Sequence, residues 1–126
     1  MIRRLQRIMT MVIICIVLFA CAAVFGVINL VRVVAADRAP RATVYIHGVF
    51  AAAALVLLVV YSIIHAQAAP IVALILFIIA ALGGFTLFGI DVVTKKPPKW
   101  LTFVHGGVAV VGFIFLLVFA FAGQGS

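Results

Sequence analysis

The sequence predicts an all-α membrane protein in which four transmembrane helices form a four-helix bundle. Hydrophobic residues make up 69% of its 126 residues and charged residues only 9%, a composition far from that of soluble globular domains. Four long apolar stretches alternate with short polar segments, and each stretch provides the roughly 20 residues that cross a bilayer. We expect one transmembrane domain, residues 1–126, with both termini on the same membrane face.

The first apolar stretch follows a cluster of arginines, Arg3, Arg4 and Arg7, as the core of a signal peptide would. Its apolar run is much longer than such a core, so we expect a retained helix. Helices are expected throughout, because backbone groups in lipid must form hydrogen bonds within their own segment. The four expected spans are 9–34, 44–66, 70–92 and 101–122.

An internal repeat relates the two halves of the chain, approximately residues 1–68 and 69–126, at an offset of 58 residues without a gap. In both copies a proline and a basic residue precede a His-Gly pair: His47-Gly48 matches His105-Gly106. We therefore expect two helical hairpins in parallel, related by a pseudo-twofold axis along the membrane normal. Both histidines would then lie at the same depth, roughly 5–10 Å from a basic loop, and could face each other.

Two matched histidines within a membrane indicate a functional site, because polar residues are costly there. The alternative is a purely structural role, in which each histidine forms a hydrogen bond to a neighbouring helix. The sharper hypothesis is a b-type haem with His47 and His105 as metal ligands. Haem iron takes axial imidazoles, and helix bundles build such sites from side chains on facing helices.

Small and basic residues flank the two histidines. Gly48 and Gly106 would leave the clearance that a flat macrocycle needs between helices. Gly26 and Gly84 are expected deeper in the partner helices, beside the buried edge of the macrocycle. Small residues also have an ordinary role in helix packing, and basic residues have one in anchoring span ends. Cations that would bind the haem propionates are expected on the nearer membrane face: Arg38, Arg41, Lys95, Lys96 and Lys99.

In pattern, these histidines resemble the bis-histidine membrane cytochromes b and the haem-binding anchor subunits of respiratory complexes. Those families place a histidine near one end of each of two helices, with glycine nearby, and exchange electrons with quinones. The resemblance covers His47-Gly48 and His105-Gly106-Gly107. It implies haem b as cofactor and a quinone or a redox protein as partner. Because the chain has only three histidines, it lacks a second matched pair, and one haem at most is implied.

The predicted function is that of a membrane electron-transfer protein, and whether it forms part of an oxidoreductase enzyme is left open. A haem-free accessory or assembly subunit of a larger membrane complex is the alternative. A small transporter is disfavoured, because both acidic residues lie at span ends rather than at mid-membrane. No catalytic residue is predicted.

The net charge of +7 is attributed to span ends that meet lipid headgroups or a bound anion, not to nucleic-acid binding. We expect an integral membrane protein in contact with the lipid bilayer, located in a bacterial inner membrane. A homo-oligomer and a place in a larger complex are both left open.

Three further polar residues have expected partners or places. His65 lies about five helical turns beyond His47 and its repeat counterpart is Gly123, so it is expected to be an interfacial histidine. A quinone-site hydrogen bond, proton exchange or a ligand shared between subunits are its alternatives. Asp91 is expected to pair with Lys95, four residues on, or with Arg32 across the bundle. Asn29 is expected to donate a hydrogen bond between helices.

Overall fold

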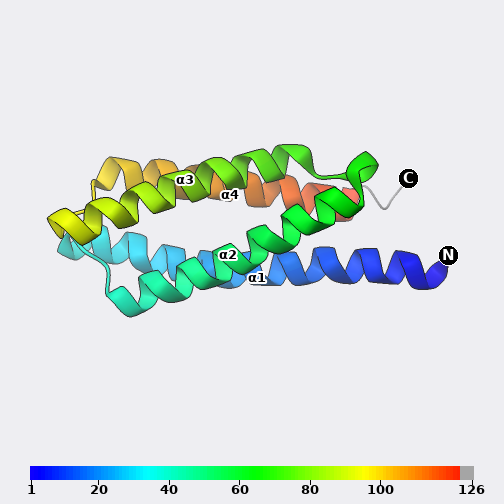
Figure 1. Ribbon diagram of the computed structural model, residues 1–126. Helices are drawn as coiled ribbons and strands as arrows, with labels where there is room; N and C mark the ends of the chain where they lie inside the picture. Colours follow the sequence, from blue (N-terminus) through cyan, green and yellow to red (C-terminus); the bar gives the residue numbers. More distant parts are fainter. Residues whose placement is uncertain (123–126) are drawn as a thin grey trace.

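The computed structural model is a bundle of four long helices joined by short connections (Figure 1). It describes residues 1–122, so that the last four residues of the second predicted repeat lie outside the described part. The described residues contain helices and connections but no strand, which confirms the predicted all-helical bundle. The elements are α1 (Ile2–Ala36), α2 (Arg41–Ile64), the short 3-10 helix η1 (Ala66–Ala68), α3 (Ile71–Thr94) and α4 (Lys99–Ala122).

All four α-helices are long and apolar enough to cross a membrane. Large apolar side chains cover the outside of the bundle; Val93, Phe85 and Phe121, for example, are 80%, 74% and 70% exposed. A soluble monomer rarely exposes so much contiguous apolar surface, whereas lipid covers it without cost. The chain is therefore an integral membrane protein in contact with the bilayer, and both ends of its described part lie at the same end of the bundle (Figure 1).

The first helix begins earlier than the apolar pattern predicts. α1 starts at Ile2, so that Arg3, Arg4 and Arg7 lie within the helix and not before it. Arginine is a good helix former, and a helix that leaves the hydrocarbon region can continue into the headgroups and water. Hydropathy therefore locates the part of α1 within lipid and not the start of the helix itself.

Two short connections, residues 37–40 and 95–98, lie at the end of the bundle opposite to the termini. We call this end the loop end. α1 and α3 end there at Asp37 and Lys95, which adopt left-handed conformations with φ of 64° and 60°. Such a residue commonly terminates a helix. The carbonyls of Pro40 and Pro98 then accept the first hydrogen bonds of α2 and α4, at 3.2 and 3.1 Å. Each of these features recurs at the repeat offset of 58 residues.

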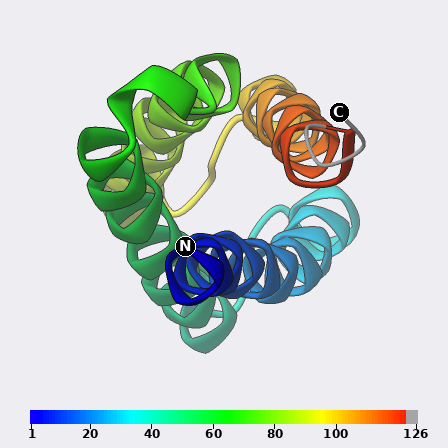
Figure 2. The ribbon, with the colours of Figure 1, turned by 90° about the vertical axis from the view of Figure 1, so that its right-hand side faces the viewer.

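The helices surround a common axis, as the end-on view shows (Figure 2). α1 packs against α2 and α4, and α3 packs against the same two helices, with the most extensive packing inside each hairpin. The diagonal pairs are therefore α1 with α3 and α2 with α4. Side chains of a diagonal pair can meet only across the bundle axis.

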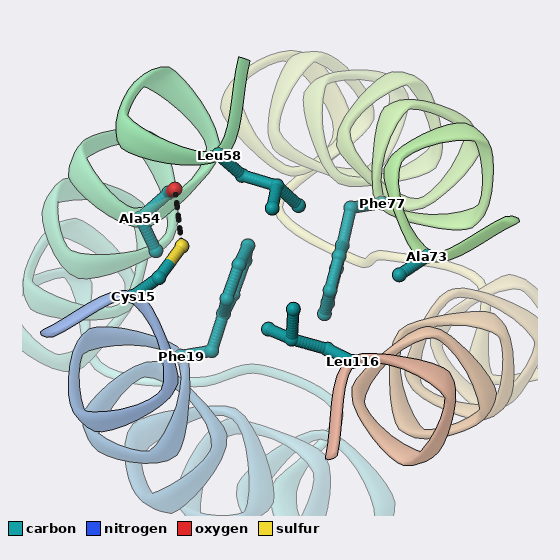
Figure 3. Packing of buried hydrophobic residues seen from close by; sticks show 7 residues of the cluster. All are labelled: Cys15, Phe19, Ala54, Leu58, Ala73, Phe77 and Leu116. Carbon is teal, nitrogen blue, oxygen red and sulfur yellow. Dashed lines mark hydrogen bonds between the residues drawn. The ribbon is translucent and has the colours of Figure 1, made fainter. Parts of the chain in front are cut away.

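Repeat-related side chains fill the centre of the bundle (Figure 3). Phe19 of α1 and Phe77 of α3 stack across the axis with ring centroids 3.8 Å apart and planes 6° from parallel. Leu58 of α2 and Leu116 of α4, 1% and 0% exposed, complete the layer. Both pairs are separated by 58 residues in the sequence, so that equivalent residues of the two hairpins lie at the same level of the bundle.

Candidate functional site

The structure brings His47 of α2 and His105 of α4 together across the bundle axis. Their ring centroids are 6.0 Å apart and their planes are 81° from parallel. Each lies seven residues beyond the proline that precedes its helix, which places it about 10 Å along the helix from the loop end. We call these two residues the histidine pair.

Both members of the histidine pair make the same hydrogen bond. His47 Nδ1 lies 2.7 Å from the carbonyl oxygen of Ala22 on α1, and His105 Nδ1 lies 2.7 Å from that of Ala80 on α3. A carbonyl oxygen can only accept, so each Nδ1–H donates. In a neutral ring this tautomer leaves the lone pair on Nε2 free, as in histidines that bind metals.

Two of the predicted glycines lie directly against the histidine rings. A Cβ atom added to Gly26 would be 3.2 Å from His47 Cε1, and one added to Gly84 would be 3.0 Å from His105 Cε1. Both distances are shorter than an ordinary contact. The neighbouring Gly83 has more room, since its added Cβ would be 3.6 Å from His105 Nδ1. The rings therefore depend on the absence of a side chain at Gly26 and Gly84, and a role for these glycines beside a macrocycle remains a prediction.

The glycines that follow the histidines have a different environment. A Cβ atom added to Gly48, Gly106 or Gly107 would meet no atom within 4 Å. Gly48 and Gly107 are exposed and Gly106 is half-buried. A Cβ atom would thus have open space at these positions, and their predicted role in clearing space for a macrocycle remains a prediction.

All five cations predicted to bind propionates lie at or next to the loop end. Two of them pair with carboxylates: Arg38 Nε lies 2.9 Å from Asp91 Oδ1, and Lys99 Nζ lies 2.9 Å from Asp37 Oδ1. Within residues 1–122, the other three form no salt bridge. The unpaired cations are Arg41, Lys95 and Lys96.

The prediction for Asp91 was wrong, because this residue pairs with Arg38 and with neither Lys95 nor Arg32. Sequence spacing points to neighbours on the same helix, whereas the observed partner lies in the connection of the other hairpin. The second salt bridge, between Asp37 and Lys99, also joins the two hairpins. Hydrogen bonding to Lys99, reinforced by the positive charges of Lys99 and Lys96, holds the pKa of Asp37 below its ordinary value.

One turn from Gly26 toward the loop end, Asn29 links α1 to α2. Its Nδ2 donates to the carbonyl oxygen of Thr43 at 3.4 Å, as the sequence predicted. Its Oδ1 is buried and has no hydrogen-bond partner among the described residues. The layer between the histidine pair and the loop end thus contains an acceptor that a ligand with a donor group could satisfy.

The third histidine lies far from the pair. His65 caps the end of α2, with its ring centroid 4.8 Å from that of Tyr61. Eighteen residues separate it from His47, a distance of about 27 Å along a helix. Its repeat counterpart, Gly123, lies outside the described residues. His65 is therefore no part of the site around the histidine pair.

Two imidazoles suit a metal that brings its remaining ligands with it. Within residues 1–122 no group of three or more His, Cys, Asp and Glu side chains could hold a bare metal ion. Haem iron already has the ring nitrogens of the porphyrin and needs only axial ligands. The histidine pair offers two such ligands from two helices, with ring centroids 6.0 Å apart. The donor set thus fits haem.

Sequence reasoning found the histidines and the glycines but missed the backbone acceptors. The carbonyls of Ala22 and Ala80 each precede their glycine by four residues, in both repeats. This Ala-x-x-x-Gly spacing, repeated at the offset of the histidines, was the available signal. In comparisons with known proteins, no protein-family model, curated protein or solved structure matches this chain.

Proposed function

We propose that this chain is a membrane electron-transfer protein of the b-type cytochrome kind, which binds one haem b between His47 of α2 and His105 of α4. One observation carries the proposal: two imidazoles related by the repeat face each other across the bundle axis, 6.0 Å apart, each held through Nδ1 by a backbone carbonyl. An isolated structural histidine would need only one such bond and no partner. A site with two imidazole ligands requires two histidines that are held in the same way and approach each other.

The polypeptide would act by holding and orienting the ligands. The carbonyls of Ala22 and Ala80 fix the ring orientation and increase the basicity of the imidazoles. The stacked Phe19 and Phe77 rings exclude water from the deep side of the site. When bound, haem supplies one-electron chemistry that the side chains alone do not offer.

The loop end provides the electrostatic complement to the proposed cofactor. Arg41, Lys95 and Lys96 have no carboxylate partner in the described chain and would bind propionates. Almost every described residue belongs to a helix, so the electrons are exchanged with a separate partner, either a quinone dissolved in the bilayer or a redox protein. Helical spans are the form of inner-membrane proteins, and we place the chain in a bacterial inner membrane.

The absorption spectrum tests this proposal. The full chain, purified in detergent from haem-replete cells, should show after reduction the sharp α and β bands of low-spin haem b, with one haem per chain. His47→Ala or His105→Ala alone should abolish those bands, because each removes one axial ligand. His65→Ala is the matched control, since it removes a histidine of the same helix from outside the site.

A colourless wild-type protein, or bands that disappear only in the His65→Ala variant, would refute the proposal. Colourless protein would favour the haem-free accessory subunit. The exposed apolar outer faces would then contact other subunits instead of lipid.

A further inference from the structure

The hydrogen bonds of the histidine pair depend on helix carbonyls that are normally covered. In an α-helix each side chain leans toward the N-terminus and lies over the preceding turn. The side chain four residues after a carbonyl therefore shields it. Here the fourth residue after Ala22 is Gly26, and the fourth after Ala80 is Gly84. Both carbonyls are thus open to a neighbouring helix and can use their second lone pair.

The contacts at these glycines are with the imidazoles themselves. A Cβ atom at Gly26 would lie 3.2 Å from Cε1 and 3.3 Å from Nδ1 of His47. One at Gly84 would lie 3.0 Å from Cε1 and 3.6 Å from Nδ1 of His105. In both rings the obstructed atom is Cε1, which is bonded to the hydrogen-bonding Nδ1, and at Gly26 the added Cβ would crowd Nδ1 as well. A methyl group at either position would therefore push the ring away from its carbonyl.

A general packing role would give a different set of contacts. At Gly112, which lies in the core of α4, an added Cβ would be 3.2 Å from Leu76 Cβ and 3.5 Å from a ring carbon of Phe77, as expected for a glycine that brings two helices close together. At Gly26 the only atoms of other residues that an added Cβ would approach within 4 Å, its own helix and chain neighbours aside, belong to His47, and at Gly84 the three nearest such atoms all belong to His105. These two glycines thus serve the histidines and not the approach of the helices.

We propose that Gly26 and Gly84 are positioning residues, which uncover the carbonyls of Ala22 and Ala80 and thereby fix both histidines with the proton on Nδ1 and the lone pair on Nε2. The consequence for metal binding rests on the proposed haem site, whereas the effect on the tautomer does not. Each glycine acts on one histidine only, because the contacts of each are confined to its own hairpin.

The tautomers can be measured by ¹⁵N NMR on the full chain, labelled at histidine nitrogens and prepared without haem, because iron bound to Nε2 would itself keep the proton on Nδ1. In the wild type, His47 and His105 should both give the pattern of a proton on Nδ1. Gly84→Ala should remove that pattern from His105 and leave His47 unchanged. Gly26→Ala should do the reverse. The unaffected histidine is thus an internal control in each variant.

Gly89→Ala provides the matched control on α3, because a Cβ atom there would meet nothing within 4 Å. It should leave both tautomers unchanged. In haem-loaded protein a second measurement applies: Gly26→Ala and Gly84→Ala should raise the reduction potential, since an imidazole without its carbonyl acceptor donates less charge to iron. Gly89→Ala should leave the potential at the wild-type value.

Two results would overturn the proposal. One is a wild-type protein in which either histidine carries its proton on Nε2, a result that needs no variant to fold. The other is an unchanged tautomer in a Gly26→Ala or Gly84→Ala variant with wild-type helix content. Failure of the haem site is distinguishable: colourless protein whose tautomers respond as expected refutes the cytochrome and supports the positioning role. A chain that binds haem, but whose tautomers in the haem-free form do not respond, refutes only the positioning role.

Discussion

In the first hairpin, Phe25 of α1 and Phe50 of α2, one and three residues from Gly26 and His47 in the sequence, have nearly parallel rings with centroids 6.3 Å apart. At the equivalent positions the second hairpin carries Gly83 and Val108, and no aromatic pair is possible there. Yet the distance from the histidine Nδ1 to the backbone carbonyl is 2.7 Å in both hairpins. The hydrogen bond that orients the imidazole therefore does not depend on the aromatic packing around it.

The acidic residues differ between the hairpins in a complementary way. The repeat equivalent of Asp37 is Lys95, and that of Asp91 is Val33. Two identical hairpins would bring two purely basic connections together at the loop end, where they would repel each other. Instead each hairpin supplies one carboxylate that pairs with a cation of the other. The departures from the repeat thus help to hold the two halves together.

The largest effect is expected from filling the space beside the histidines. Gly48→Leu combined with Gly106→Leu should abolish haem binding, because the added side chains would occupy the clearance proposed for the macrocycle. Membrane insertion should stay intact, because leucine is apolar and its Cβ has open space at both positions. Gly106 is half-buried and Gly48 exposed, so Gly106→Leu alone should reduce the haem content more. Haem per chain, measured by pyridine haemochrome, compares these variants with Gly89→Leu as a control. Wild-type haem content in the double variant would contradict the clearance role of both glycines.

Phe19 and Phe77, which form the central stack, should contribute equally to the stability of the bundle. Phe19→Ala or Phe77→Ala should each lower the free energy of unfolding by about 1–3 kcal/mol, from lost packing and ring stacking. The cost stays below that of a soluble core because lipid also solvates the released ring. Reversible unfolding in mixed micelles measures it. Since the rings contact each other, the double variant should cost less than the sum of the single variants; additive costs would contradict the stacked geometry.

A smaller difference is expected between repeat-equivalent cations. Arg38→Gln should destabilise the bundle by about 1 kcal/mol, because the salt bridge with Asp91 is partly buried and makes two contacts. Lys96→Gln, its repeat equivalent, should have little effect on stability because Lys96 has no salt bridge in the described chain. The same unfolding measurement compares them. Equal losses would show that net charge at the loop end matters and the specific pair does not.

The smallest effect concerns pH. The folded-state pKa of Asp37 is lowered by Lys99, so the contribution of this pair is present above the ordinary pKa of aspartate, about 4, and is lost as the pH falls through the lowered value. Asp37 is exposed to solvent, so salt should screen the effect. Asp37→Asn should flatten the dependence of stability on pH in this acidic range. An unchanged slope would show that the Asp37–Lys99 pair does not cause that dependence.

The fold was predictable from the sequence because lipid imposes strict requirements on length and on hydrogen bonding, and four apolar stretches meet them. The convergence of His47 and His105 followed from the repeat. The contacts of Gly26 and Gly84 did not follow, because they depend on how α1 rotates against α2 and α3 against α4, which a uniformly apolar sequence does not specify. The partner of Asp91 was missed for a related reason: it depends on how one hairpin docks on the other.

The Phe19–Phe77 stack closes the bundle axis on the deep side of the histidines, and this sets the electrical depth of the site. A charge that enters from the loop end crosses about 10 Å of a roughly 30 Å hydrocarbon core, a third of the transmembrane voltage. At about 2.3 kcal/mol per elementary charge and 100 mV, that work is roughly 0.8 kcal/mol. Entry from the opposite face would cost about twice as much. The membrane voltage therefore acts unequally on charges that reach the site from the two faces.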